Sequence, residues 1–359
     1  MNQKRITLAI DARPLSRGSG GIQRYLKRII PHLIASGEFD IILYSDGLIE
    51  GVPDDILSKI KVRQTLRGKL AAVSWYWMAP IWIRLDRADS YWSPRHHLPF
   101  FTPKSTATIV TIHDFVWKKV PQTMPRIQWL TERLLMPTAI RSTNKIICIS
   151  QTTQSQLEEY FPGAEKKSKV ILHGEETSSH ITGPSNTSKS VDSYFLTVGT
   201  LEPRKNYESL IRAFDMYCSE GGTVDLIIVG KNGWNYQSIY DEKNKSNFSS
   251  RIKILNSVND EELITLYQGA QGFISISIDE GYGLPPQEAM AFGLPILLST
   301  IDVYRELYPS ADLWVNNHDI NEISHAISQL NKLPKKNTYT PNGRLWSDCA
   351  KQHIKYIKA

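Results

Sequence analysis

Short apolar runs alternate with longer amphipathic segments along the whole chain. In the first half, the apolar runs predict strands at 5–10, 40–44, 90–93, 107–113, 145–149 and 169–172. Between the first two runs, apolar residues from Ile22 to Leu33 recur every three or four positions, which predicts a helix over 22–35. Strands that alternate with helices in this way are typical of parallel sheets built from βαβ units.

The segment 181–192 interrupts this pattern. It is rich in Ser, Thr, Gly and Pro and has almost no large apolar residues, so we interpret it as a linker between two domains. A second series of strands follows at 194–198, 224–229, 252–255, 272–276, 295–298 and 313–315. Asn259 and Asp260 are predicted to cap a helix at 261–269.

The pattern therefore predicts the α/β class, with two doubly wound Rossmann-like domains that face a cleft lined by the carboxyl ends of their strands. The length of 359 residues fits two domains of ordinary size. The expected division is an N-terminal domain at 1–180, the linker at 181–192, a C-terminal domain at 193–342 and a final helix at 343–359.

The composition excludes several classes of protein. Hydrophobic residues make up 41% of the chain and charged residues 22%, a balance that excludes disordered, collagen-like and coiled-coil chains. The longest apolar stretch, 71–83, is shorter than the roughly 18 to 20 residues that span a bilayer, so no transmembrane segment is predicted. Cys148, Cys218 and Cys349 lie far apart, which argues against a disulfide framework or a zinc site and fits a reducing cytoplasm.

The net charge of +6 is unevenly distributed. Up to Ser178 there are 25 Lys and Arg against 16 Asp and Glu, a balance of +9, whereas the remainder has 17 against 20, a balance of -3. A basic half attracts phosphates, anionic lipid or nucleic acid, although a solvated basic surface without a partner explains the charge equally well. The chain lacks the usual nucleic-acid-binding motifs, so no nucleic-acid partner is expected.

Two motifs in the first half carry candidate chemistry. Gly20 and Gly21 open the first predicted helix, where glycine lets the backbone approach a ligand and the helix start offers amides to an anion. A flexible turn without a ligand is the alternative. His113 and Asp114 end the strand at 107–113 and could bind sugar hydroxyls or move a proton. A lone histidine is more often structural, and the other histidines are interpreted in that way.

Two further motifs lie in the second half. Arg204 and Lys205 follow a strand at a predicted helix start, where a pair of cations can clamp a diphosphate. Glu280 is expected at a strand end and Glu288 in the first turn of the next helix. Taken alone, these charges could equally be a solvated helix start and partners of a helix dipole. The turn between the two glutamates would direct its amides to a ligand and consists of Gly281, Tyr282, Gly283 and Leu284.

These motifs together resemble a known family. The sequences GGIQRY, TIHDF, VGTLEPRKN and EGYGLPPQEAM occur in this order, and the chain is similar over nearly its whole length to the retaining glycosyltransferases of family GT4, which have the GT-B fold. The resemblance implies that Arg204 and Lys205 bind the donor diphosphate, that Glu288 holds the ribose hydroxyls, and that Glu280 and His113 lie beside the transferred sugar.

The resemblance has further implications for the two domains. Gly20 and Gly21 would approach the diphosphate or the acceptor, the turn at 281–284 would bind the donor, and the final helix would cross back onto the first domain. Asp114 and Arg95 are assigned to acceptor binding. The family usually has Pro-Ser before its glutamate motif, whereas Ser277 here follows an isoleucine, a departure that concerns base and acceptor contacts more than the diphosphate.

The sequence also bears on metal and mechanism. Many sugar-nucleotide transferases hold a divalent metal with Asp-x-Asp, which this sequence lacks. We therefore expect no metal or other cofactor, with Arg204, Lys205 and helix amides supplying the positive charge. Since no carboxylate is clearly placed beneath the sugar, same-face attack is favoured, with the departing phosphate accepting the proton of the acceptor.

The donor and acceptor are expected from resemblance and charge. The TLEPRKN form resembles mannosyltransferases that use GDP-mannose in bacterial surface polysaccharide assembly. One alternative is the same reaction with a UDP- or dTDP-sugar donor. The other is a GT-B protein that binds a nucleotide sugar without transferring it. The expected acceptor is a polyprenyl-diphosphate-linked glycan at an anionic membrane surface on the cytoplasmic side. This expectation depends on a basic and aromatic block that would face the membrane. The alternative is that its aromatic part is a helix packed on the sheet. The block comprises Lys59, Lys61, Arg63, Arg67, Lys69, Trp75, Tyr76, Trp77 and Trp82.

Overall fold

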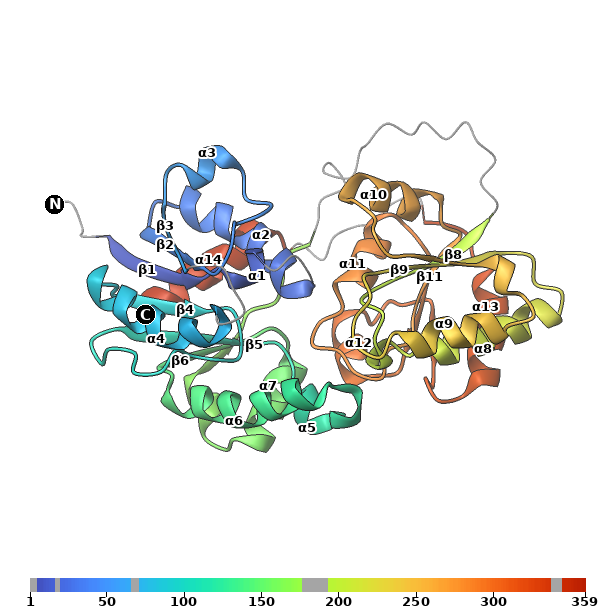
Figure 1. Cartoon of the computed structure of the whole chain (residues 1–359). Helices are drawn as coiled ribbons and strands as arrows, with labels where there is room; N and C mark the ends of the chain where they lie inside the picture. The colour runs from blue at the N-terminus through green and yellow to red at the C-terminus, as the bar shows by residue number, and fades with distance from the viewer. Residues whose placement is uncertain (1–4, 17–19, 66–70, 176–192, 337–343) are drawn as a thin grey trace. The chain divides into compact units, whose positions relative to one another are not determined.

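The chain folds into two compact units, each built around its own sheet (Figure 1). The computed structural model describes residues 5–16, 20–65, 71–175, 193–336 and 344–359. The first unit comprises Met1–Lys118, Arg126–Gly174 and Arg344–Ala359, and the second comprises Lys119–Pro125 and Glu175–Gly343. The predicted linker at 181–192 lies outside the described residues.

The first unit contains a parallel sheet of seven strands in the order β3-β2-β1-β4-β5-β6-β7. The strands are β1 (Ile6–Asp11), β2 (Phe39–Ser45), β3 (Lys61–Gln64), β4 (Ser90–Ser93), β5 (Ala107–Ile112), β6 (Lys145–Cys148) and β7 (Ser168–Val170). The helices of this part of the chain are α1 (Arg13–Ser16), α2 (Gly21–Ala35), α3 (Asp54–Leu57), α4 (Ala71–Leu85), α5 (Val116–Lys119), α6 (Arg126–Ser142), α7 (Gln151–Tyr160) and α14 (Trp346–Lys358).

Helices cover both faces of this sheet. Successive strand residues point to opposite faces, so Leu8 and Ile10 of β1 pack with α2 and α14, whereas Ala9 packs with α4. Val110 and Ile112 of β5 pack with α6 and α7 on the same side as α4. Figure 1 shows α4, α6 and α7 together on one side of the strands.

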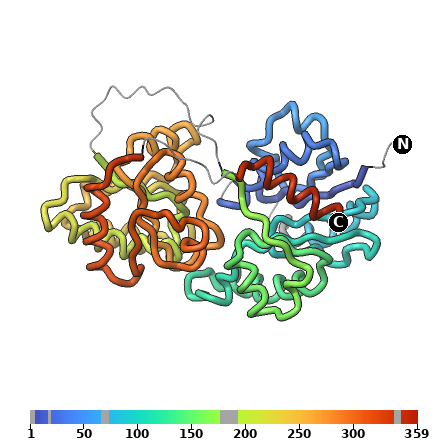
Figure 2. The backbone as a smooth tube through the Cα atoms, turned by 180° about the vertical axis from the view of Figure 1, so that it is seen from behind, coloured from blue at the N-terminus to red at the C-terminus, as the bar shows by residue number. Residues whose placement is uncertain are grey.

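The last helix of the chain, α14, belongs to the first unit. Its buried residues Trp346, Cys349 and Ala350 join the core that also contains Tyr25 of α2, and Figure 2 shows this helix in red within that unit. A Cβ added to Gly174 would lie 2.4 Å from the Cα of Trp346. Glycine is therefore required at position 174, where the backbone passes close to the start of α14.

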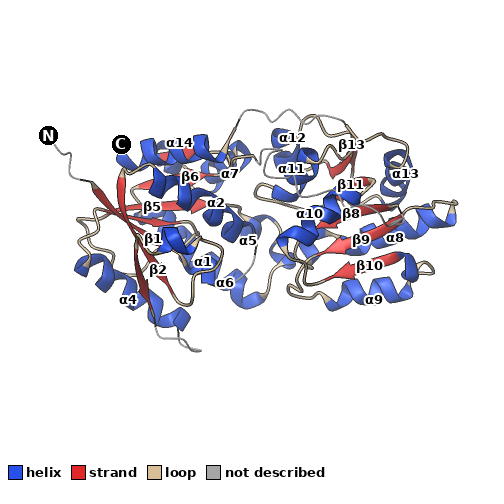
Figure 3. Cartoon of the chain, turned by 90° about the horizontal axis from the view of Figure 1, so that it is seen from above, coloured by secondary structure: helices blue, strands red, loops and turns tan. Residues whose placement is uncertain are grey.

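The second unit contains a parallel sheet of six strands in the order β10-β9-β8-β11-β12-β13, again flanked by helices (Figure 3). Its strands are β8 (Tyr194–Val198), β9 (Asp225–Val229), β10 (Ile252–Leu255), β11 (Gly272–Ser275), β12 (Ile296–Ser299) and β13 (Leu313–Val315). Its helices are α8 (Tyr207–Ser219), α9 (Gln237–Lys245), α10 (Asp260–Gly269), α11 (Leu284–Ala291), α12 (Asp302–Leu307) and α13 (Ile320–Leu330).

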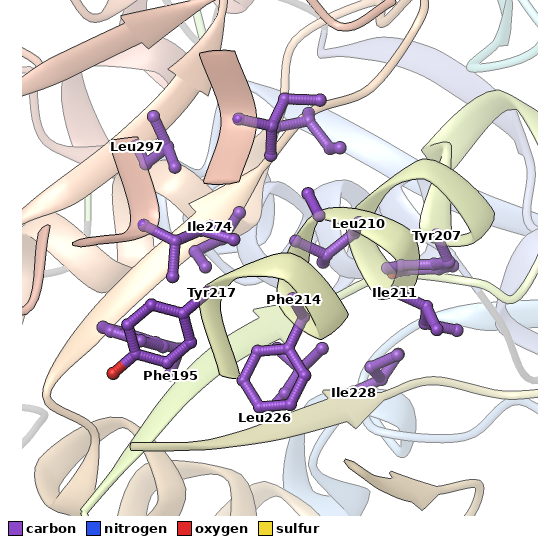
Figure 4. Packing of buried hydrophobic residues seen from close by; sticks show 14 of the residues in the cluster. Phe195, Tyr207, Leu210, Ile211, Phe214, Tyr217, Leu226, Ile228, Ile274 and Leu297 are labelled. Atoms are coloured by element: carbon purple, nitrogen blue, oxygen red, sulfur yellow. The ribbon is translucent and has the colours of Figure 1, made fainter. Parts of the chain in front are cut away.

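One face of this second sheet packs against α8. Leu210, Phe214 and Tyr217, spaced along one face of the helix, are buried against strand residues that include Phe195 and Leu226 (Figure 4). Apolar residues at these intervals form a continuous stripe on an α-helix. The packing anchors the N-terminal end of α8, which follows the turn that carries Arg204 and Lys205.

The predicted α/β class with two doubly wound parallel sheets is confirmed. Each strand predicted from the sequence is present, with ends that differ by at most two residues. The strand that the sequence did not reveal is β3, an edge strand with the sequence KVRQ. It has a single apolar side chain, Val62, which is itself exposed, so no apolar pattern marks it.

The basic and aromatic block at 59–82 is divided by the fold, so its interpretation as one membrane-facing block is wrong. Trp75 and Trp82 are buried and make edge contacts with Tyr44 at centroid distances of 6.5 and 5.4 Å. Trp77, in contrast, is 57% exposed. Arg67 and Lys69 lie outside the described residues. No helix in the described parts of the chain is long and apolar enough to cross a membrane.

Candidate active site

Arg204 and Lys205 lie in a turn that precedes helix α8. The turn is a single 3-10 segment, Pro203–Lys205, and α8 begins only at Tyr207. The two cations were expected at a helix start, and they lie in a separate 3-10 turn directly before α8. Asn206 causes the interruption, because its left-handed conformation (φ 59°) is incompatible with a continuous helix. Its side-chain amide donates to the carbonyl oxygen of Asn317 at 2.7 Å, which fixes the turn.

The two cations converge on the carboxylate of Glu280. Nη1 of Arg204 donates to Oε2 at 2.7 Å, and Nζ of Lys205 donates to Oε1, which also accepts from Oγ of Ser277 at 2.8 Å. The guanidinium of Arg204 also donates to the carbonyl oxygen of Asp279 at 2.9 Å and to Glu202 at 2.7 Å. The contacts are contributed by two loops, one after β8 and one after β11.

The environment of Glu280 keeps its carboxyl group ionised. Glu280 is buried, and burial alone would raise its pKa. Arg204 and Lys205 outweigh that effect and lower the pKa of Glu280 to about 2. A buried carboxylate that is paired with two cations and hydrogen-bonded on both oxygens is a rigid anchor for those cations.

Arg204 and Lys205 differ in what they can still offer to a ligand. The Arg204 fork is occupied by Glu202, Glu280 and the carbonyl of Asp279. An ammonium has three N–H donors, and within the described parts of the chain Lys205 uses one of them, toward Glu280. The geometry therefore makes Lys205 the cation with donors to spare and Arg204 the one that orders the turn.

The turn between the two glutamates is built on a glycine conformation. Gly283 has a φ of 86°, and a Cβ there would lie 2.5 Å from Cε1 of Tyr304. Its carbonyl oxygen accepts from Oη of Tyr308 at 2.6 Å. Strand β11 ends at Ser275, so Glu280 lies five residues beyond the strand and not at its end as expected.

Helix α11 positions Glu288. It begins at Leu284, with Pro285 as its second residue, so Glu288 lies one turn into the helix and not in the first turn as expected. Oη of Tyr267, from α10, donates to Oε2 of Glu288 at 2.9 Å. Tyr267 is itself buried and stacks on Phe292, with centroids 5.1 Å apart. The orientation of Glu288 is therefore fixed by a tyrosine that the sequence did not single out.

In the first unit, His113 follows β5 directly and is buried. Its Nε2 lies 2.8 Å from the carbonyl oxygen of Pro94, so Nε2 carries the proton and Nδ1 is an acceptor. Burial, together with the neighbouring His96, lowers the pKa of His113 to about 3. The ring is therefore neutral at neutral pH.

His113 is held by a second group of side chains. Its backbone N–H donates to Nε2 of His96 at 3.0 Å. Oε2 of Glu132, on α6, contacts Nδ1 of His96 at 3.2 Å and Nε2 of His97 at 3.1 Å. The interpretation of His96 and His97 as structural histidines agrees with their burial, but Glu132 had no signal in the sequence because its partners lie 35 and 36 residues away.

The remaining predicted residues of the first unit lie in loops or, for Gly21, at the first position of α2. Asp114 accepts a hydrogen bond from the backbone N–H of Val116 at 3.2 Å. Burial and the neighbouring Arg13 lower the pKa of Arg95. Gly20, with a φ of 91°, precedes α2, and a Cβ on Gly20 or Gly21 would meet nothing within 4 Å. The backbone at these two glycines is therefore open to approach, and their role in binding stays a prediction.

The predicted site residues thus form two groups. Arg204, Lys205 and Glu280 contact one another in the second unit, with Glu288 on α11 of the same unit. His113 and the residues predicted around it belong to the first unit. Where the structure is described, no three His, Cys, Asp or Glu side chains are grouped so that they could hold a metal ion. Metal independence of the reaction stays a prediction.

Comparison with protein families assigns both parts of the chain. A family model described as "Glycosyltransferase Family 4" matches residues 19–178, and one described as "Glycosyl transferases group 1" matches residues 183–346. Together these matches extend over most of the chain, and each falls mainly on one of the two units.

Individual proteins agree with this assignment. The O-antigen chain mannosyltransferase RfbU of Salmonella typhimurium is 24% identical over 337 residues, which cover 91% of this chain and 92% of that protein. The O-antigen chain mannosyltransferase B of Escherichia coli is 31% identical over 173 residues, or 46% of this chain and 45% of that protein. The crystal structure of Anabaena HepE in complex with UDP and glucose covers 99% of this chain and 100% of its own, with a TM-score of 0.75 and 16% identity. The chain belongs to the GT-B glycosyltransferases, with a family 4 domain followed by a group 1 domain.

Proposed function

We propose that the protein transfers a mannosyl residue from GDP-mannose to a lipid-linked glycan during O-antigen assembly, at the cytoplasmic face of the membrane. The names of its relatives support the sugar and the process. The single observation that supports a diphosphate-containing donor is the convergence of Arg204 and Lys205 on Glu280 in the group 1 domain. This arrangement presents anchored positive charge of the kind that binds a diphosphate.

In the proposed reaction, Lys205 binds the diphosphate of the donor with the N–H groups that Glu280 does not use. Arg204 holds the turn in place and adds its charge. As the bond between the sugar and the phosphate breaks, negative charge grows on the departing diphosphate, and these fixed cations stabilise it without having to reorganise. No metal ion is required in this scheme.

The acceptor hydroxyl attacks from the same face that the diphosphate leaves. Its proton passes to the departing phosphate oxygen, and the anomeric configuration of the sugar is retained. His113 binds a hydroxyl of the transferred sugar through Nδ1, because its Nε2 proton is committed to the carbonyl of Pro94. Glu280 lies beside the same sugar. Asp114 and Arg95 contact the acceptor.

The nucleotide is bound in the second unit. Glu288 accepts hydrogen bonds from the ribose hydroxyls, in the orientation that Tyr267 gives it. The amides of the turn at 281–284, which comprises Gly281, Tyr282, Gly283 and Leu284, face the donor. Gly20 and Gly21 of the first unit let the backbone approach the diphosphate or the acceptor.

A donor panel tests this proposal. GDP-mannose, UDP-glucose, UDP-galactose and dTDP-rhamnose are each incubated with the protein and a polyprenyl-diphosphate-linked glycan, and products are identified by mass spectrometry. We expect a hexose increment with GDP-mannose, an axial linkage by NMR that reports retention, and an unchanged rate after EDTA treatment. A product with a UDP- or dTDP-sugar alone would overturn the donor, and loss of activity in EDTA that Mn²⁺ restores would overturn metal independence.

The same panel addresses the alternative of binding without transfer. Calorimetric titration with GDP-mannose, in the absence of an acceptor, measures binding separately from turnover. Binding without product on any acceptor would identify a nucleotide-sugar-binding protein in place of a transferase.

A further inference from the structure

Helix α4 has two apolar faces, and only one of them packs on the sheet. Trp75, Ala79, Trp82 and Ile83 are buried. The opposite face carries Trp77, Met78, Ile81 and Leu85, of which Trp77 is 57% and Leu85 65% exposed. A helix that is apolar all round is normally covered on all sides. The exposed stripe of α4 therefore has the composition of a surface that is covered in use.

The loop that follows β4 enlarges this apolar surface. Phe101 is 71% exposed, and Phe100 is also exposed. The ring of Trp77 lies 6.3 Å from that of Phe100 and 5.8 Å from that of Phe101. Two segments that are distant in sequence thus bring their largest apolar side chains together. We call these residues the α4 patch: Trp77, Met78, Ile81, Leu85, Phe100 and Phe101.

The segments that carry the α4 patch also carry exposed positive charge. Arg84, Arg87 and Lys104 are exposed in the same two segments. Asp86 does not offset them, because its carboxylate is buried and paired with Lys61 and Arg63, each at 2.6 Å. Exposed aromatic side chains next to cations match the boundary of an anionic bilayer, where rings enter the headgroup region and cations meet phosphates.

Helix α6, on the same side of the sheet, repeats this pattern. Ile127, Leu130 and Leu134 lie at successive turns and are exposed, Ile127 to 83%. Arg126 and Arg133 are exposed beside them. The two helices are linked through His97, which contacts Tyr76 of α4 at 3.4 Å and Glu132 of α6 at 3.1 Å. Helix α6 therefore also exposes apolar side chains with cations nearby in its sequence.

We propose that the α4 patch docks the first unit on an anionic lipid bilayer, with Trp77 and Phe101 entering the headgroup region and Arg84 and Lys104 binding lipid phosphates. This inference rests on the proposed function in one respect, namely that a lipid-linked acceptor is reached at a membrane. The docking itself needs neither donor nor acceptor, so it is tested separately.

The test measures co-sedimentation of the full chain with vesicles of phosphatidylcholine alone or with 30% phosphatidylglycerol as a chosen composition. We expect binding to the anionic vesicles that weakens as salt rises, since charges on a surface are screened beyond about 10 Å at 0.1 M salt. The double variant Trp77→Gln/Phe101→Gln and the double variant Arg84→Gln/Lys104→Gln should each weaken binding at least tenfold. Leu48→Gln is the matched control, because Leu48 is 64% exposed in the same unit but lies outside the patch.

Each outcome decides for or against the proposal. Equal binding of wild type and Trp77→Gln/Phe101→Gln would overturn it, as would equal loss in the Leu48→Gln control. A third outcome is that the wild-type chain does not bind vesicles but self-associates in sedimentation velocity, and that the same variants abolish this association. The patch would then be an interface between copies of the chain, and the proposal would be overturned. Transfer to a short soluble acceptor, measured for every variant, reports the proposed function independently of lipid.

Discussion

The backbone N–H of His113 donates to Nε2 of His96 at 3.0 Å, and this contact defines the tautomer of the neutral His96 ring. Nε2 must carry a lone pair to accept that bond, so the proton of a neutral His96 lies on Nδ1, which faces Oε2 of Glu132 at 3.2 Å. Burial favours the neutral ring, but the carboxylate of Glu132 raises the pKa of His96 above its usual value. Protonation of His96 would place two N–H groups against each other and release the backbone of His113.

Glu132→Gln should therefore move the acid limb of the pH–rate profile toward lower pH. The variant removes the carboxylate that raises the pKa of His96. The His96 ring therefore stays neutral down to a lower pH and continues to accept the hydrogen bond from the backbone of His113. The measurement is kcat/KM for transfer as a function of pH, with Glu159→Gln on α7, an exposed glutamate, as control. An unchanged acid limb in Glu132→Gln would show that His96 does not act through His113.

The first unit should lose stability when the pH falls below about 6.5. Burial lowers the pKa of His113 to about 3 and that of His353 to about 4. An unfolded histidine binds a proton near pH 6.5. Between the native and the unfolded pKa, these histidines are protonated in the unfolded chain but neutral in the native state. The free energy of unfolding therefore falls by about 1.4 kcal/mol for each unit that the pH is lowered, for each such histidine.

Thermal unfolding followed between pH 7 and pH 5 measures this effect. His353→Gln removes one of the buried rings and should flatten the dependence, whereas His325→Gln, which removes an exposed histidine of α13, should leave it unchanged. A wild-type midpoint that does not fall between pH 7 and pH 5 would contradict the neutral state of these rings.

Lys205→Ala should reduce kcat by about 100- to 1,000-fold, the loss observed when one donor to a developing anion is removed. Arg204→Ala should reduce kcat similarly and also lower the unfolding temperature, because Glu280 and Glu202 both lose a partner. Arg212→Ala, which removes an exposed arginine of α8 paired with Glu242, is the control. A Lys205→Ala enzyme with a near-normal kcat would refute the role of Lys205 at the diphosphate.

Glu288→Gln should raise the KM for the donor with little change in kcat, because contacts with the ribose are the same before and during the reaction. Tyr267→Phe should do the same more weakly, because it removes only the hydrogen bond that orients Glu288. Glu280→Gln should instead lower kcat. Steady-state kinetics on the three variants tests the distinction, which fails if KM and kcat change alike in all of them.

Gly283→Ala should destabilise the second unit by about 1 to 3 kcal/mol, from its left-handed backbone and the contact with Tyr304. Gly221→Ala is the matched control in the same unit. Gly221 has a φ of 91°, but a Cβ there meets nothing within 4 Å. This variant is therefore destabilised only by the left-handed backbone conformation and not by a steric contact. Chemical denaturation should rank Gly283→Ala as the less stable, and the reverse order would exclude the contact with Tyr304 as a cause.

The sequence predicts well what depends on local pattern. The buried parallel strand β8 is an apolar run between polar segments, and its limits agree with the structure to the residue. The edge strand β3 could not be found in this way, because its burial is slight and its side chains are mostly polar. It forms because the backbone of β2 pairs with it. Backbone pairing does not require particular side chains, so a short edge strand has no recognisable sequence pattern.

The same limit applies to the site. The cations and glutamates could be named because they cluster in short motifs, but their mutual contacts span 75 residues or more. Tyr267 orients the predicted Glu288, and Glu132 contacts His96, which in turn holds the predicted His113. Neither Tyr267 nor Glu132 belongs to a sequence motif. The left-handed Asn206 separates the 3-10 turn that carries Arg204 and Lys205 from α8, and the sequence pattern does not reveal this conformation.

The placement of α14 has a consequence for the order of folding during synthesis. The first unit takes its last helix from residues that follow the whole second unit in the chain. Until Trp346 and Cys349 leave the ribosome, the apolar side of α2 lacks part of its cover, and Tyr25 lacks the His353 side chain that lies 2.5 Å from its hydroxyl. The second unit, although translated later, is nearly continuous in sequence and can close first. We therefore expect the nascent chain to carry an incomplete N-terminal unit while the C-terminal one is already folded.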